Sequence, residues 1–163
     1  ATSGAIDVKA GATSIASATS GANTSVTGAT ATIGSVTAGG NYAIAATGDV
    51  TLGTAANQTQ RAAGTITIAG RNIAEGAAGL TLTANSDSAG AGPATLTASG
   101  NIALANATIN GGPARQSDVS LTSTGDTTVK AVNAANIAAN AGGGITLTTA
   151  SAANNVKIGR AHV

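Results

Sequence analysis

Pairs of aliphatic residues separated by one other residue recur along the whole chain. The intervening residue is usually small or polar, as with Thr51, Thr67 and Thr81. Alternation with a period of two is typical of a short β-strand that buries one of its faces. The pattern therefore predicts a succession of short strands, each with two inward aliphatic side chains. The pairs are Ile6/Val8, Val50/Leu52, Ile66/Ile68, Leu80/Leu82, Ile102/Leu104, Val119/Leu121, Ile145/Leu147 and Val156/Ile158.

Turn residues stand directly before several of these pairs, at Gly48-Asp49, Gly100-Asn101 and Gly125-Asp126. Glycine with Asp or Asn is typical of tight turns. Most successive pairs are between 14 and 26 residues apart. A repeating unit of about 20 residues that cannot bury its own apolar face predicts a solenoid of stacked coils, roughly eight of them. Further aliphatic residues between the pairs predict more than one strand in each coil.

Two other structures fit part of the pattern. The alanine-rich segment from Ala131 to Ala141 could form a short helix, but Asn133, Asn136 and Asn140 interrupt it and disfavour a helix interior. A β-sandwich also has many short strands joined by glycine-rich turns. It would normally use larger core residues than this chain provides. The narrow interior of a solenoid suits small aliphatic side chains better.

The composition supports a small-residue interior. Tyr42 is the only aromatic residue, and Phe, Trp, Met and Cys are absent. Such a chain cannot build the bulky core of an ordinary α/β enzyme. Only 8% of the residues are charged, which does not match the high charge of a disordered chain. We therefore expect an ordered, all-β protein.

The charge pattern argues against several partners. The basic residues are scattered, and no aromatic residues accompany them, so no nucleic-acid surface is predicted. No apolar run of about 18 residues is present, so no transmembrane segment is predicted. The absence of cysteine excludes disulfides and thiolate metal sites. The basic residues are Lys9, Arg61, Arg71, Arg115, Lys130, Lys157 and Arg160.

The acidic residues do not form a pattern that indicates catalysis. They occur singly, whereas a polysaccharide-cleaving enzyme needs carboxylates that converge on one groove. Asp49 and Asp126 follow glycine just before a strand, where an aspartate caps a turn. The only histidine, His162, falls in the C-terminal residues 158–163 that we expect to be an artefactual tail, so no Ser-His-Asp triad is predicted. We expect no enzymatic activity, no catalytic residues, no metal site and no cofactor.

Threonine pairs of the form Thr-x-Thr are the one feature that suggests a specific binding surface. Rows of such pairs on one flat face resemble ice-binding β-helices, and a glycan is the other ligand considered. The competing explanation is that threonine favours strands and coats their outer face. The candidate surface-binding residues are Thr65, Thr67, Thr81, Thr83, Thr95, Thr97, Thr146 and Thr148.

Several segments share a turn-strand pattern: Gly48 to Leu52 (GDVTL), Gly100 to Leu104 (GNIAL), Gly143 to Leu147 (GGITL) and Ser123 to Val129 (STGDTTV). In this pattern the chain resembles the filamentous haemagglutinin family of large bacterial exoproteins. The resemblance implies a right-handed parallel β-helix and export by two-partner secretion through an outer-membrane transporter. It also implies a secreted or cell-surface location and a role as a structural or adhesive rod that holds a distal binding or toxic tip away from the cell. Host-cell or surface receptors would then be bound through other parts of the full protein. Similar repeats occur in autotransporter passengers, which remain an alternative.

The last six residues, 158–163 (IGRAHV), resemble the translation of a common sequencing adapter. We therefore expect residues 1–157 to form the repeat segment and residues 158–163 to be an artefactual tail. That tail would contain His162 and Arg160.

Overall fold

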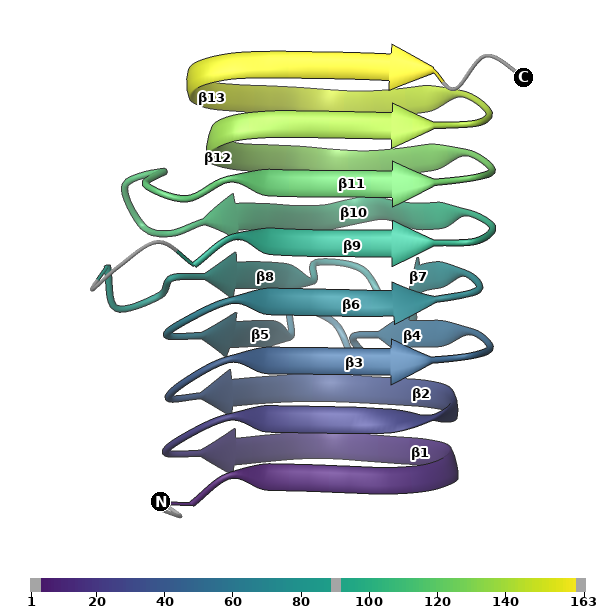
Figure 1. Ribbon diagram of the computed structural model, residues 1–163, viewed down its shortest axis with the longest axis vertical. Helices are drawn as coiled ribbons and strands as arrows, with labels where there is room; N and C mark the ends of the chain where they lie inside the picture. Colours follow the sequence, from purple (N-terminus) through teal and green to yellow (C-terminus); the bar gives the residue numbers. More distant parts are fainter. Residues whose placement is uncertain (1–3, 89–91, 161–163) are drawn as a thin grey trace.

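The computed structural model describes residues 4–88 and 92–160, and in this part of the chain the regular structure is entirely β (Figure 1). The prediction of an all-β protein is confirmed. The thirteen strands are β1 (Ile6–Ser20), β2 (Thr24–Ala38), β3 (Tyr42–Ala46), β4 (Val50–Leu52), β5 (Thr59–Ala62), β6 (Ile66–Gly70), β7 (Ile73–Glu75), β8 (Thr81–Ala84), β9 (Ala94–Ala98), β10 (Ile102–Gly111), β11 (Val119–Ser123), β12 (Thr127–Ala141) and β13 (Ile145–Arg160).

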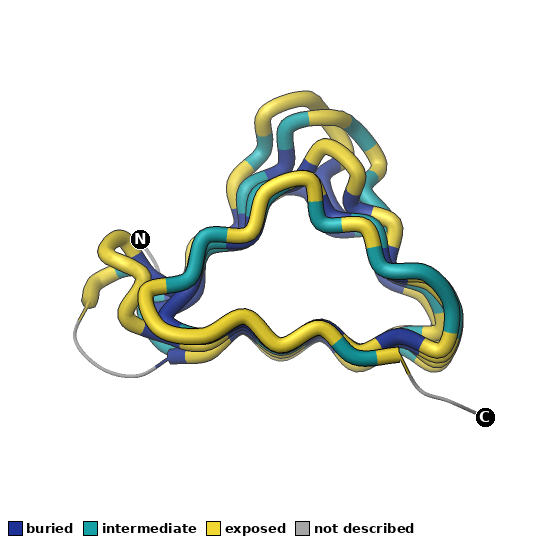
Figure 2. The backbone as a smooth tube through the Cα atoms, turned by 90° about the horizontal axis from the view of Figure 1, so that it is seen from above, coloured by how far each residue is buried: buried dark blue, intermediate teal, exposed yellow. Residues whose placement is uncertain are grey.

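All strand pairs are parallel, and the chain climbs along one axis in stacked turns. Ile6 pairs with Thr24, and Thr24 pairs with Tyr42, so these turns contain 18 residues each. The turn between Ile66 and Ala94 is longer, with 28 residues. Seen along the axis, the backbone forms a triangle whose corners carry the longer excursions (Figure 2). The extra residues of long turns therefore leave at the corners and do not disturb the strands.

The triangle has three faces. Face A contains β3, β6, β9 and β11, face B contains β4 and β7, and face C contains β5 and β8. Strands β1, β2, β12 and β13 bend at the corners and contribute to all three faces, and β10 contributes to faces B and C. Each residue on a face thus lies beside the corresponding residue of the next turn. We call each turn of the stack a rung.

The predicted fold class, an open β-helix, is wrong because the sheet closes on itself. From β2 the pairings run through β4, β7 and β10 to β12 on one side, and through β3, β6, β9 and β11 to the same β12 on the other. Nine parallel strands therefore close into a barrel-like ring, and β1, β5, β8 and β13 lie outside it. This arrangement replaces the open, right-handed parallel β-helix of roughly eight irregular coils. The ring closes because β2 and β12 each bend at corners and pair with strands of more than one face.

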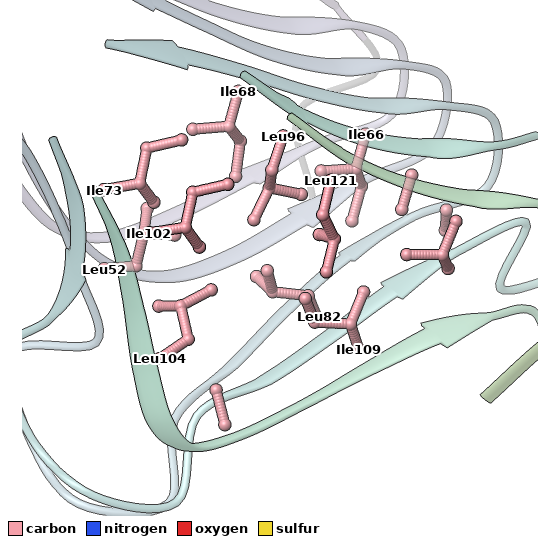
Figure 3. Packing of buried hydrophobic residues seen from close by; sticks show 14 of the residues in the cluster. Leu52, Ile66, Ile68, Ile73, Leu82, Leu96, Ile102, Leu104, Ile109 and Leu121 are labelled. Carbon is pink, nitrogen blue, oxygen red and sulfur yellow. The ribbon is translucent and has the colours of Figure 1, made fainter. Parts of the chain in front are cut away.

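The interior is filled by aliphatic side chains from all three faces (Figure 3). On face A, Ile68, Leu96 and Leu121 follow one another in successive rungs, and all three are fully buried. Small buried residues lie beside them, with Ala94 on the same strand as Leu96 and Ala139 paired with Leu121. Five of the eight period-two aliphatic pairs are thus buried in the interior, as the sequence predicts. The pairs on the terminal strands β1 and β13 are only partly covered or exposed.

One buried polar pair crosses this interior. The Tyr42 hydroxyl donates to Gln60 Oε1 at 3.3 Å, and Gln60 Nε2 donates to the carbonyls of Ile33 and Gly34 at 2.9 and 2.7 Å. Both side chains are fully buried. Burial raises the pKa of Tyr42 far above its usual range, so its hydroxyl stays protonated. The single aromatic ring is therefore a packing residue of the core.

The alanine-rich segment that could have been a helix is part of β12. Ala131 and Val132 pair with Thr108 and Ile109 of β10, and the strand continues to Ala141 beside β11. Within this segment Val132, Ala134, Ile137 and Ala139 belong to the aliphatic core. Parallel pairing on both sides of β12 outweighs the helix propensity of its alanines.

The first and last strands each have one neighbour among the described residues, β2 for β1 and β12 for β13. Two apolar side chains of β13 are accordingly exposed, Val156 by 46% and Ile158 by 57%. Residues 158–160, the described start of the expected artefactual tail, continue β13 and pair with residues 139–141 of β12. His162 lies outside the described residues.

Candidate functional site

The eight threonines singled out from the sequence are divided among the three faces and the corners between them. Thr67 and Thr95 are neighbours on face A, and Thr97 lies beside Thr122 one rung further on. Thr67 and Thr97 are exposed, whereas Thr95 is partly covered. Thr65 precedes β6 at a corner, and its backbone N–H donates to Asn41 Oδ1 at 2.9 Å.

Three of the other four threonines lie on faces B and C. Thr81 and Thr83 are on β8 of face C, and Thr146 is on β13 of face B beside Thr128. Thr148 follows at the corner of β13. The structure therefore does not bring the eight residues into one array. Whether any of them binds ice or a glycan stays a prediction.

Face C carries a row of polar side chains whose members come from five successive rungs. Three of them are joined: Asn133 Nδ2 donates to Asn110 Oδ1 at 3.0 Å, and Asn110 Nδ2 donates to Thr83 Oγ1 at 3.4 Å. All three are only partly covered. The row as a whole, from β5 to β13, is Arg61, Thr83, Asn110, Asn133 and Ser151.

The loop after β10 folds over this row and makes a groove. Gly112, Pro113 and Arg115 form its wall, and Thr83, Asn110 and Asn133 line its floor, around a volume of about 400 Å³. Nη1 of Arg115 donates to Ser151 Oγ at 2.5 Å, so the side chain extends across the row to β13.

A second hollow of about 180 Å³ adjoins the first, because Thr83 lines both. Its other lining residues are Thr59, Arg61 and Ser86. Among the described residues Arg61 makes no ion pair. We call the two hollows together, with the polar row beneath them, the face C groove.

Buried hydrogen bonds hold the loops beside the groove in place. Asn85 Nδ2 and the N–H of Gly92 both donate to Ser117 Oγ, at 3.1 and 3.0 Å. Asn85 and Ser117 are almost completely buried, so the loop after β8 is tied to the loop after β10. Gly112 has a φ of 88°, which favours glycine and turns the chain towards Arg115. The wall of the groove is therefore preorganised.

A second polar ladder runs along the corner before face B and explains the Gly-Asn and Gly-Asp motifs. Asn101 Oδ1 accepts the backbone N–H of Asp126 at 2.8 Å, and Asp126 Oδ1 accepts that of Gly144 at 2.7 Å. A Cβ on Gly125 would collide with Asn101 Oδ1. These side chains bond to the backbone of a tight turn, as expected of a cap. The tight turn that each of them caps belongs to the next rung and not to its own.

At the start of the same ladder, Asp49 forms a two-point ion pair with Arg71. Arg71 Nε and Nη2 donate to the two carboxylate oxygens at 3.0 and 2.7 Å, and Asn72 Nδ2 donates at 2.8 Å. The hydrogen bonds from Arg71, followed by that from Asn72, lower the pKa of Asp49 from 3.8 to about 2. The charged form is therefore favoured in the folded protein.

This shift predicts an acid-sensitive contribution to stability. Because the folded pKa is below the unfolded one, Asp49 stabilises the fold above its unfolded pKa of 3.8, and this contribution is lost as the pH falls to about 2. We expect Asp49→Asn to reduce the difference in urea unfolding free energy between about pH 5 and pH 2. Asp7→Asn is the control, since it also removes a carboxylate that forms an ion pair. Asp7 pairs with Lys9, and both side chains are exposed on strand β1. An unchanged difference in Asp49→Asn would contradict the prediction.

The acidic groups do not converge. No group of three or more His, Cys, Asp or Glu side chains that could hold a metal ion occurs within residues 4–88 and 92–160. Glu75 lies at a corner, where its Oε1 accepts the backbone N–H and the side-chain amide of Asn106 at 2.7 and 2.8 Å. No helix in this described part of the chain could span a membrane.

Sequence reasoning missed the face C groove. Asn110 and Asn133 are separated by 23 residues, and Thr83 lies 27 residues before Asn110, so their alignment depends on unequal loop lengths. The only signal in the sequence is that these polar residues each follow a buried aliphatic residue, Leu82, Ile109 and Val132.

Comparison with known proteins adds no assignment. No protein-family model matches the chain, and no curated protein or solved structure is significantly similar to it. Any functional conclusion therefore depends on the residues and their geometry.

Proposed function

We propose that the chain is a structural or adhesive rod segment of a large secreted bacterial surface protein. The observation that carries this proposal is the unbroken stack of parallel rungs from β1 to β13 along one axis (Figure 1). Each added turn lengthens such a stack by about 4.8 Å, the spacing of neighbouring strands. A chain built in this way produces length and stiffness rather than a catalytic pocket.

The side chains support the same role. Continuous hydrogen-bond ladders on three faces and an aliphatic interior resist bending, because every rung pairs with its neighbours on all three faces. The resemblance of the Gly48 to Leu52 and Gly100 to Leu104 segments to filamentous haemagglutinins supports export to the cell surface. In this role the segment holds a distal tip away from the cell.

The location can be tested in the organism that encodes the chain. Antibodies raised against the purified protein should label intact cells, and gold particles should lie outside the outer membrane in electron micrographs. An antibody against a cytoplasmic enzyme is the control and should label only permeabilised cells. Labelling by both antibodies only after permeabilisation would overturn the proposal.

Ice binding by the threonine rows has weaker support. Thr59, Thr81 and Thr108 are in register on face C, but the adjacent row contains Arg61 and Asn110 in place of threonine. A regular two-row lattice is thus interrupted. Thermal hysteresis of the purified protein would distinguish this activity from that of a rod.

A further inference from the structure

We propose that the face C groove binds a linear polysaccharide that carries carboxylate groups, with its chain lying parallel to the axis of the stack. This inference goes beyond the rod role, since a rod needs no ligand along its side. It rests on the shape of the groove, the chemistry of its floor and the placement of two arginines.

The groove is long in the direction of the axis. Its row of polar residues comes from five successive rungs, and neighbouring parallel strands are about 4.8 Å apart, so the row from Arg61 to Ser151 extends roughly 19 Å. An extended polymer of several sugars fits this dimension better than a compact small molecule. The loops after β8 and β10, which flank the groove, are joined by the hydrogen bond from Asn85 Nδ2 to Ser117 Oγ.

The floor has the chemistry to bind hydroxyl groups. The side-chain amide of Asn has two N–H donors and an oxygen with two lone pairs. Asn110 and Asn133 each use one N–H within the ladder. A second N–H on each is thus left for a ligand, and Thr83 adds a hydroxyl. Sugar hydroxyls both donate and accept, and they match such a mixed set.

The positive charges of two arginines favour sugars that carry carboxylate groups. Arg61 lies at one end of the row, and Arg115 reaches Ser151 at the other. A guanidinium has five N–H donors and binds carboxylates through paired hydrogen bonds, so Arg115 can keep Ser151 and still bind an anion. The row contains no acidic residue. Asp87 and Asp118 lie on the flanking loops, and Asp118 Oδ1 accepts hydrogen bonds from Asn136 at 3.1 and 2.8 Å.

The same features disfavour a nucleic acid as the polymer. Single strands are bound largely by stacking of bases on aromatic side chains. Tyr42 is the only aromatic residue, and it is completely buried. A uronic-acid polysaccharide needs hydrogen bonds and carboxylate pairing, both of which the groove supplies.

The test uses the full chain and oligogalacturonate as the probe. Isothermal titration should detect binding to oligogalacturonate and none to neutral dextran of similar length. The double variant Arg61→Gln/Arg115→Gln should weaken binding by about tenfold or more. Lys130→Gln is the matched control, since it removes an exposed positive charge at a corner of β12, and it should bind like the parent.

Asn133→Asp provides a second variant that places a negative charge in the floor and should also weaken binding. Unchanged circular dichroism would show that each variant is folded. Absence of binding by the parent chain, equal weakening in Lys130→Gln, or tighter binding of single-stranded DNA than of oligogalacturonate would each overturn the proposal. None of these outcomes bears on the surface-labelling test of the rod role.

Discussion

Replacing Leu96 by alanine should lower the free energy of unfolding by about 2–5 kcal/mol. Leu96 is completely buried on face A, between Ile68 of the preceding rung and Leu121 of the following one. Removal of its branched end leaves a cavity that the two neighbours cannot fill, because their own strands are fixed by parallel hydrogen bonds. Urea denaturation followed by circular dichroism measures the change.

Thr97→Ala is the matched control for this substitution. Thr97 is the next residue in β9, but its side chain is exposed on the outer surface. Its removal should change the unfolding free energy by no more than about 0.5 kcal/mol. Equal effects of the two substitutions would show that the strand does not bury the face assigned to the interior.

Replacing Gln60 by alanine should cost about 1–3 kcal/mol. The substitution removes the acceptor of the Tyr42 hydroxyl and the donor to the Gly34 carbonyl in a fully buried position. Both groups would then lack these partners where water does not reach them. The same denaturation experiment measures the loss.

Tyr42→Phe separates the two halves of this interaction. It removes only the hydroxyl, and Gln60 keeps its hydrogen bonds to the carbonyls of Ile33 and Gly34. We therefore expect a smaller loss than in Gln60→Ala. A larger loss in Tyr42→Phe would mean that the long 3.3 Å bond contributes more than the two shorter ones.

The strands could be predicted from the sequence because each carries its own signal. Val119 and Leu121 flank Ser120 with a period of two, and the structure places them in β11 with Ser120 facing outward. The alanines of β12 carry the opposite local preference, but Val129, Val132 and Ile137 still mark the buried side. Local pattern therefore identifies the buried face even where propensity misleads.

The closure of the sheet could not be predicted in the same way. It depends on which strands remain continuous at the corners, and nothing in the sequence of β2 distinguishes a bend from a break. The face C groove could not be predicted from the sequence for a related reason. Arg115 reaches Ser151 across 36 residues of chain, and only the register of the intervening rungs brings the two together.

The uneven length of the turns has a consequence for how such a chain can change. The 18-residue and 28-residue turns deliver the same strand positions to their neighbours, because the surplus is confined to corners such as the one between β8 and β9. A corner can thus acquire a new peptide without altering the ladder. Lineages could diversify these excursions independently, and an engineer could graft an epitope there while leaving the scaffold intact.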